Sequence, residues 1–347
     1  MKKLFVSLTV VFFALFLLLV SGCDNTPGAP KEELVLLKLV PGEAAGIFCV
    51  NVERAAALEI TKDWLDSYKK DMEKPKEDKL FENYRDFADN TGIELGRDIR
   101  AVSAAFFGKT PIAVDMKAAK DIDMVVLFDL DYDKNKILTV LKEKLLGKKI
   151  EYKEETYKDA VVLKIKEGEN KEAALSFVND KTIALGKPGR VKQVIDLSLG
   201  EGGSILDQAK IKPFLESAEI GSLISFAFII PEELKKVHDV ARMFSADLTK
   251  AEIVFGLADH RGSTWLGEFQ LVSPNAEGNA QIASVLNTLL SAAALASPEV
   301  GELIGAINIS SSADALKLTF SVSDELAKKL QEKALGKKPG LVPPPEK

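Results

Sequence analysis

The residues with the most distinctive chemistry stand near the N-terminus, where a cysteine follows one aliphatic and two small residues. Val20, Ser21, Gly22 and Cys23 match the pattern at which a signal peptidase cuts before a cysteine whose thiol carries diacylglycerol. The freed amino group of Cys23 can be acylated as well, and two or three acyl chains anchor a protein stably, whereas one does not. The pattern predicts cleavage between Gly22 and Cys23 and lipidation of Cys23.

The segment before this cysteine has the composition of a cleavable leader. Lys2 and Lys3 supply positive charge, and residues 4–20 are apolar except for Ser7 and Thr9. Residues 1–22 are therefore predicted to be a lipoprotein signal peptide. The alternative is an uncleaved transmembrane helix, but the run is at the short limit of about 17 residues for spanning a bilayer. The small residues before the cysteine and the polar residues after it favour cleavage.

The residues after the cysteine predict a short tether and a location. Residues 23–39 comprise the lipidated cysteine and the tether, which contains Pro27, Gly28 and Pro30. Asp24 resembles the signal that retains lipoproteins in the inner membrane of enteric-type Gram-negative bacteria. We therefore expect a lipid-anchored protein of the bacterial cell envelope that faces the periplasm or the exterior, with the inner membrane favoured if the cell is Gram-negative.

Alternating acidic residues in the first half raise the possibility of a metal site. Asp129, Asp131 and Asp133 resemble the start of a calcium-binding loop. The sixth position, however, is Lys134 where the turn requires glycine, and the twelfth is Val140 where a bidentate glutamate is required. The other interpretation is a strand end whose aspartates face water, with Asp133 capping the next helix. We expect no metal centre and treat these three residues as the weak candidate.

Other catalytic patterns are missing from the sequence. The two histidines, His238 and His260, have no second histidine or cysteine at metal-ligand spacing, and His260 is expected to be exposed at a hairpin tip. Cys49 lies in an apolar run and is expected to be buried. Residues 186–190 lack the spacing of a phosphate-binding loop. We therefore predict no cofactor and no enzymatic activity.

Composition and charge exclude some classes of partner. The chain has 347 residues, of which 46% are hydrophobic and 28% charged, with a formal net charge of -6. Lysine and glutamate alternate along the chain, whereas a nucleic-acid-binding protein needs a basic stripe. The expected partners are the membrane, through the acyl chains on Cys23, and an envelope protein or an apolar ligand, but not nucleic acid.

The order of hydrophobic patterns predicts an α+β fold with antiparallel sheets, packed helices and two related halves. Residues 124–146 and 264–290 both read as a strand, a short polar turn and a long helix. We assign residues 40–203 to the first half and 204–335 to the second. Residues 336–347 are rich in proline and lysine and are predicted to be disordered.

Several segments together resemble a known group of proteins. Residues 92–99 (Gly-Ile-Glu-Leu-Gly-Arg-Asp-Ile) stand between a predicted helix and strand, and residues 177–188 form a hairpin that leads into a helix. Residues 204–207 (Ser-Ile-Leu-Asp) precede a short helix and the strand at 222–230. This order is similar to that of a broad group of uncharacterised bacterial exported lipoproteins with domains of unknown function. The resemblance implies an α+β fold and a surface location, and the group has no known catalytic residues to transfer.

Three functions are compatible with these observations. The first is a lipid-anchored cell-envelope protein with a non-enzymatic binding or scaffolding role. The second is a carrier or chaperone that holds an apolar ligand, either lipid or peptide, in a cleft between sheet and helices. The third is a hydrolase whose site has no recognisable motif.

Overall fold

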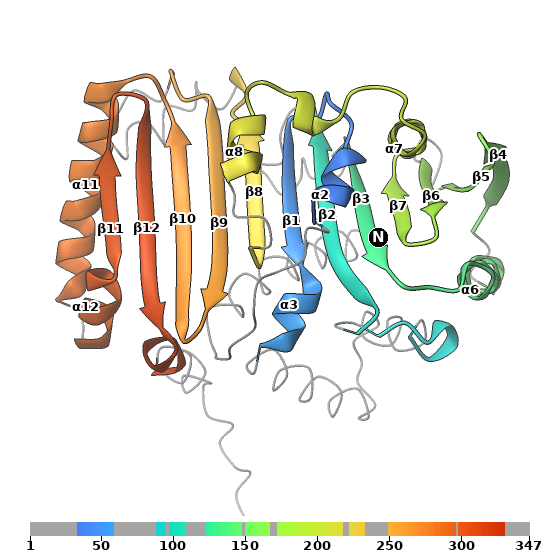
Figure 1. The fold of residues 1–347 in the computed structure, drawn as a ribbon, viewed down its shortest axis with the longest axis horizontal. Helices are drawn as coiled ribbons and strands as arrows, with labels where there is room; N and C mark the ends of the chain where they lie inside the picture. Colours follow the sequence, from blue (N-terminus) through green and yellow to red (C-terminus); the bar gives the residue numbers. More distant parts are fainter. Residues whose placement is uncertain are drawn as a thin grey trace, which may run out of the picture.

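The computed structural model describes residues 33–58, 88–94, 97–108, 123–147, 150–166, 172–217, 222–232, 249–295 and 298–329. Twelve strands in these ranges form one antiparallel sheet in the order β11-β12-β10-β9-β8-β1-β2-β3-β7-β6-β5-β4 (Figure 1). The strands are β1 (Gly46–Asn51), β2 (Ile99–Phe107), β3 (Asp123–Leu130), β4 (Tyr152–Tyr157), β5 (Ala160–Lys166), β6 (Glu172–Asn179), β7 (Thr182–Gly186), β8 (Ile224–Ile229), β9 (Ile253–Arg261), β10 (Thr264–Val272), β11 (Ile307–Ser311) and β12 (Ala315–Ser323). The helices are α2 (Glu33–Lys38), α3 (Val52–Ala57), α6 (Lys134–Gly147), α7 (Pro188–Ser198), the 3-10 turn η2 (Ile205–Asp207), α8 (Lys212–Ser217), α11 (Ala276–Ala294) and α12 (Pro298–Gly305), and residues 324–329 are also helical.

The α+β class is confirmed, and the same order of elements occurs on each side of the sheet centre. On one side, the neighbouring strands β1, β2 and β3 are followed by α6. On the other side, the neighbouring strands β8, β9 and β10 are followed by α11 and α12. The chain then returns so that β7 pairs with β3, and β12 with β10. The two halves share one sheet because β1 pairs with β8, which sets Phe48 opposite Phe226.

The expected boundary after residue 203 falls in the connection between β7 and β8, and it stays a prediction. Contacts across this point join the two segments closely. The amide of Gly42 donates to the carbonyl of Gly203 at 2.9 Å, and that of Ile205 donates to Val40 at 2.9 Å. The start of the predicted second half is therefore hydrogen-bonded to the loop that follows α2.

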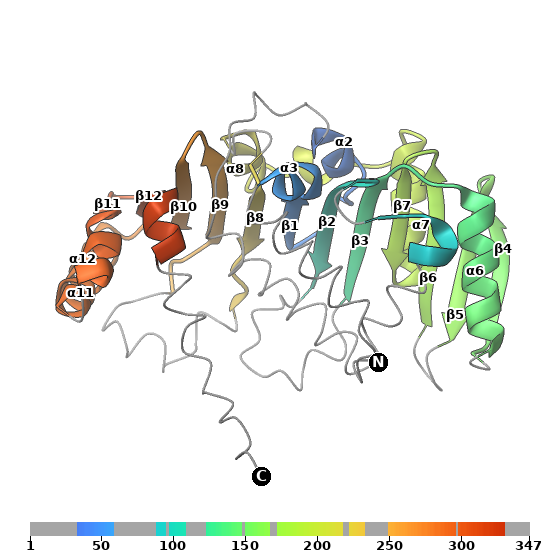
Figure 2. The ribbon, with the colours of Figure 1, turned by 90° about the horizontal axis from the view of Figure 1, so that it is seen from below.

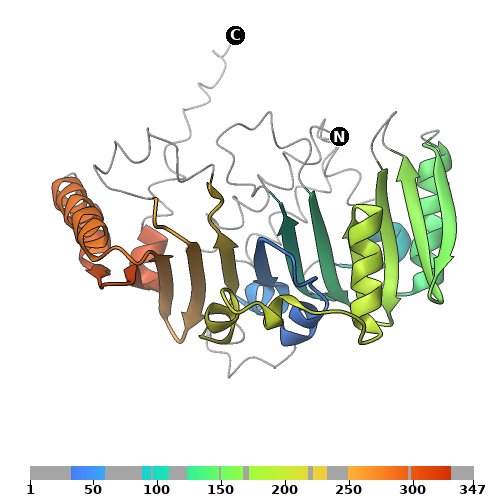
Figure 3. The same ribbon diagram turned by 90° about the horizontal axis from the view of Figure 1, so that it is seen from above.

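One face of the sheet, here called the front face, is turned to the viewer in Figure 1 and carries α7, α2, η2 and α8. These helices lie in a row along the sheet, as Figures 1 and 3 show. Beneath them, alternate residues of the central strands form a core that includes Ile47, Val125 and Phe255. Cys49 belongs to this core and is 6% exposed, so its predicted burial is confirmed.

The opposite face, here called the back face, carries α6, α11, α12 and the turn at 324–329 (Figure 2). Strand β12 shows why these helices pack there. Leu316, Phe320 and Val322 alternate with polar residues and project to the back face, where they join the cores beneath α11 and the turn at 324–329. Within the described ranges, no helix is both long and apolar enough to cross a membrane.

Two glycines near the join between β7 and α7 give a prediction about this packing. A Cβ atom on Gly186 would lie 2.5 Å from the carbonyl oxygen of Met124 and 2.9 Å from Cα of Val125, both backbone atoms of β3. A backbone cannot move aside as a flexible side chain does, so we expect Gly186→Ala to destabilise the fold by about 2 kcal/mol. Urea unfolding followed by circular dichroism measures this change.

The matched control is Gly189, in the first turn of α7. A Cβ atom there meets nothing within 4 Å. Gly189→Ala should therefore stabilise the protein by roughly 0.5–1 kcal/mol, through the better helix propensity of alanine. Equal unfolding midpoints for the two variants would contradict the close approach of β7 to β3.

Candidate functional site

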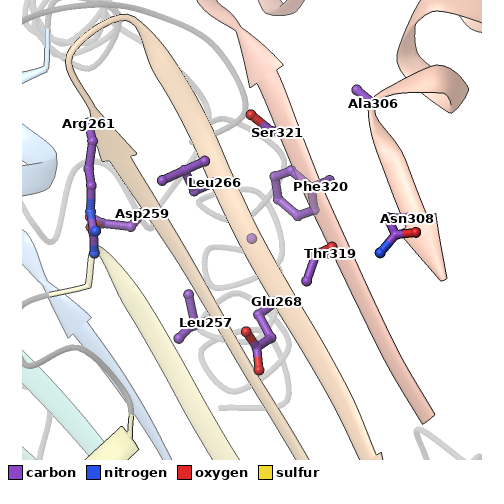
Figure 4. A pocket seen from close by; sticks show the side chains of 11 residues that line it. Leu257, Asp259, Arg261, Leu266, Glu268, Ala306, Asn308, Thr319, Phe320 and Ser321 are labelled. Carbon is purple, nitrogen blue, oxygen red and sulfur yellow. The ribbon is translucent and has the colours of Figure 1, made fainter. Parts of the chain in front are cut away.

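A concavity lies on the front face at the β9–β12 end of the sheet (Figure 4). Its volume is about 490 Å³. The lining residues come from β9, β10, β11 and β12 and from Ala306, which immediately precedes β11. They are Leu257, Asp259, Arg261, Leu266, Gly267, Glu268, Ala306, Asn308, Thr319, Phe320 and Ser321.

Strand register brings these residues together from positions far apart in sequence. Glu268 pairs with Leu257 on one side and with Thr319 on the other, and Thr319 pairs with Asn308. Successive side chains of a strand point to opposite faces, so directly paired residues share a face. The residues between them, including Trp265 and Val322, pack into the back-face core.

Charged groups in the concavity are arranged as ion pairs. Asp259 is 3% exposed, and its Oδ2 accepts a 2.9 Å hydrogen bond from Nε of Arg261. Its Oδ1 lies 2.9 Å from Nη2 of Arg54 in α3, in an ion pair that lacks hydrogen-bond geometry. Glu268 pairs with Nζ of Lys317 at 2.6 Å. Both carboxylates are thus matched by cations from neighbouring strands or from α3.

The β11–β12 side of the concavity adds neutral hydrogen-bonding groups. Asn308 and Ser321 are exposed, and Thr319 lies between them on the same face. An amide and two hydroxyls can each donate and accept hydrogen bonds. Together with the ion pairs, this lining is suited to holding a polar or charged partner.

The weak metal candidates are engaged by protein groups. Asp129 and Asp131 both face Arg100, whose Nη1 lies 2.8 Å from Oδ2 of Asp131 and whose Nε donates to Oδ2 of Asp129 at 3.2 Å. The hydrogen bond to Asp129 raises the pKa of Arg100 above its ordinary value. In the described ranges, no group of three histidine, cysteine or acidic side chains is arranged to hold a metal ion.

Asp133, the third of these aspartates, caps the N-terminus of a helix. Oδ1 of Asp133 accepts hydrogen bonds from the amides of Asn135 at 2.9 Å and Lys136 at 3.0 Å. These are the bonds of a helix N-cap, which satisfy amides that have no partner within the helix. The structure therefore places Asp133 at the start of α6, as the helix-cap interpretation states.

The expectation that His260 is exposed is wrong. Its side chain is buried, and Nε2 donates to Oδ1 of Asp324 at 2.9 Å. The ring centroid lies 4.8 Å from that of Trp265. Strand β9 continues to Arg261, so the turn comprises only two residues and His260 projects into the back-face core. His260 and Asp324 are 64 positions apart in the sequence, so no local pattern predicts this contact.

The residues of the predicted lipid anchor lie outside the described residues. These are Gly22, Cys23 and Asp24, and His238 is also outside. Lipidation of Cys23 therefore stays a prediction from the sequence.

Comparisons with known proteins do not assign the chain to a family. No family model matches the sequence, and no curated protein matches it. Similar solved structures include crystal form III of TP0453, with a TM-score of 0.46 and 10% identity over 85% of this chain and 97% of that chain. Crystal form I of TP0453 has a TM-score of 0.45 and 11% identity over 88% of this chain and 98% of that chain. The resemblance to uncharacterised exported lipoproteins stays a prediction.

Proposed function

We propose that this chain is a lipid-anchored cell-envelope protein that binds a polar partner, without catalysing a reaction, in the concavity at the β9–β12 end of its sheet. The leader and the cysteine pattern at residues 20–23 support the anchor. The observation that carries the binding role is the concavity itself, which gathers exposed hydrogen-bonding groups and paired charges from four strands and α3.

The polarity of the lining favours this role over transport of a purely apolar ligand. Leu257 and Leu266 offer apolar surface, but Asp259, Arg261, Glu268, Asn308, Thr319 and Ser321 are polar or charged. An apolar ligand would remove these groups from water without giving them new hydrogen bonds, and that loss is unfavourable. A partner with its own hydrogen-bonding groups can pair with these side chains, so its binding avoids that unfavourable loss.

Site-specific photocrosslinking in living cells tests the binding surface. A photoreactive amino acid at Asn308 or at Ser321 should give the same crosslinked partner in the membrane fraction, because both residues line the concavity. The control position is Leu289, which is 55% exposed on α11 and lies on the back face. The charge reversal Glu268→Arg should weaken the adduct at Asn308, because it places a second cation beside Lys317.

Two outcomes would contradict the proposal. The same partner crosslinked equally at Leu289 would show that capture does not depend on the concavity. An adduct at Asn308 that is unchanged by Glu268→Arg would show that the charged lining takes no part in binding.

A further inference from the structure

The two halves of the chain differ in the number of strands that follow the long helix. In the first half, α6 leads into β4, β5, β6 and β7, and β7 pairs with β3. In the second half, α11 and α12 lead into β11 and β12, and β12 pairs with β10. Strand β11 therefore corresponds to β6. The outer side of β6 pairs with β5, whereas no described strand lies outside β11.

The backbone groups on the outer edge of β11 follow from the ladder on its inner side. The amide of Ser321 donates to the carbonyl of Ala306 at 3.0 Å, and that of Ser312 donates to Ala315 at 2.8 Å. Bonded and non-bonded pairs alternate in an antiparallel ladder, so the even-numbered residues of β11 bond to β12. The odd-numbered residues turn their N–H and C=O groups away from β12. They are Ile307, Ile309 and Ser311.

The two outermost strands of the sheet differ in their protection. Charged side chains and proline on an edge strand discourage pairing with another chain. Strand β4 carries Lys153, Glu154 and Glu155, whereas β11 (Ile-Asn-Ile-Ser-Ser) contains neither a charged residue nor proline. Of the two edges, that of β11 is therefore suited to accept a further strand.

Helix α11 provides an apolar surface behind this edge. Figures 1 and 2 place it at the outer end of the sheet, and it contacts β11 and β12. Ile282, Leu286 and Leu289 recur at helical spacing and share one stripe of the helix. Ile282 is 5% exposed and packs with Leu286 against β11 and β12, but Leu289 is 55% exposed. The apolar stripe thus continues past the part that the sheet covers.

The first half shows what covers the equivalent surface. Val162 of β5 belongs to the front-face core, so its neighbour Leu163 faces the back, the side of α6, and is 0% exposed. Nζ of Lys142 in α6 pairs with the carboxylate of Glu154 in β4. In the first half, extended strands therefore lie over the back-face helix, where the second half leaves Leu289 exposed.

We propose that an extended segment of a partner protein joins the sheet as a strand antiparallel to β11 and lies over α11. Its backbone pairs with the outward N–H and C=O groups of β11, and apolar side chains at alternate positions cover Leu286 and Leu289. A second copy of this chain fits less well, because pairing through its own β11 would bring its α11 to the space where this α11 already lies. The edge site is separate from the concavity and does not depend on it.

A peptide with the sequence of β5, Ala160–Lys166, is the probe, because β5 fills the equivalent edge of β6. Its fluorescein-labelled form is titrated with the purified full-length chain and followed by anisotropy. Ser311→Pro removes an outward N–H without removing a bond to β12, and Leu289→Glu places a charge on the exposed stripe. Each change should raise the Kd about tenfold.

The matched controls place the same new residues elsewhere. The amide of Lys166 donates to Glu151 at 2.9 Å, so by the same alternation the N–H of Thr156 points outward from β4. Thr156→Pro therefore alters the other edge, and Leu199→Glu alters a leucine that follows α7 and is 56% exposed. Both should leave the Kd within about twofold of the wild-type value. Circular dichroism checks that all four variants fold.

Three results would overturn the proposal. The first is the absence of peptide binding by the wild-type chain, or equal losses in the test and control variants. The second is a wild-type dimer that Ser311→Pro converts to a monomer in sedimentation, since a second copy would then occupy the edge. The third is loss of peptide binding in Glu268→Arg but not in Ser311→Pro, which would place the peptide in the concavity and leave the proposed function standing.

Discussion

Replacing Cys23 by serine is expected to abolish acylation completely, because a hydroxyl does not take the place of the thiol in the transfer of diacylglycerol. The leader of residues 1–22 would then stay attached, since the peptidase that recognises this pattern acts on the modified cysteine. Metabolic labelling with a palmitate analogue and intact-mass measurement of the purified chain report the two effects directly. The wild-type chain should begin at Cys23 and carry two or three acyl chains.

The second cysteine of the chain provides a matched control. Cys49 is 6% exposed in the front-face core, where it accepts a hydrogen bond from the hydroxyl of Ser103 at 3.3 Å. Cys49→Ala should keep the label and the processed N-terminus. Label that persists in Cys23→Ser, or that is lost in Cys49→Ala, would refute the predicted lipid anchor.

Removing the carboxylate of Asp324 is expected to destabilise the fold by about 3 kcal/mol, because the buried partner His260 would lose its hydrogen bond. The side chains of His260 and Asp324 are 1% and 6% exposed, so water does not readily replace the lost contact. His260 Nδ1 and Trp265 Nε1 already lack a hydrogen-bond partner in the described part of the chain. Asp324→Ala would add Nε2 of His260 to these unsatisfied atoms. Urea unfolding followed by circular dichroism measures the loss.

Two further variants separate this contact from a general effect on the helical turn. Asp324→Asn keeps the Oδ1 acceptor, so it should lose less stability than Asp324→Ala. Glu325→Ala removes the neighbouring acid, whose side chain is 80% exposed and pairs with Lys329 on the surface. That change should be much smaller, because exposed ion pairs contribute little. Equal losses for Asp324→Ala and Glu325→Ala would contradict a role for the buried pair.

Features set by neighbouring residues could be predicted from the sequence. The alternation of apolar and polar residues in β12 is typical of a strand with one buried face, and the structure places Leu316 and Val322 in the back-face cores. Asparagine is a favoured residue at helix N-caps, and the side chain of Asn275 accepts a hydrogen bond from the amide of Gly278 at the start of α11. These outcomes depend on side-chain periodicity and on local hydrogen bonds, which a single segment carries by itself.

The concavity could not be found in this way. Its lining alternates with core residues along β9, β10, β11 and β12, and each strand alone reads as an ordinary half-buried strand. Only the pairing of Glu268 with Leu257 and Thr319 brings the polar faces together. Arg54, which follows β1, reaches Asp259 across more than two hundred positions of sequence, and no local pattern records that contact.

The sequence by itself determined the α+β class and the order of strand, turn and helix at residues 124–146 and 264–290, because each depends on residues close together in the chain. The leader and the acylation of Cys23 stay predictions from the sequence. The tertiary structure alone decided that β1 pairs with β8 to make one sheet, that Arg100 engages Asp129 and Asp131, and that His260 is buried against Asp324. These contacts form only when distant segments meet, since strand pairing and ion pairing depend on position in space rather than on separation along the chain.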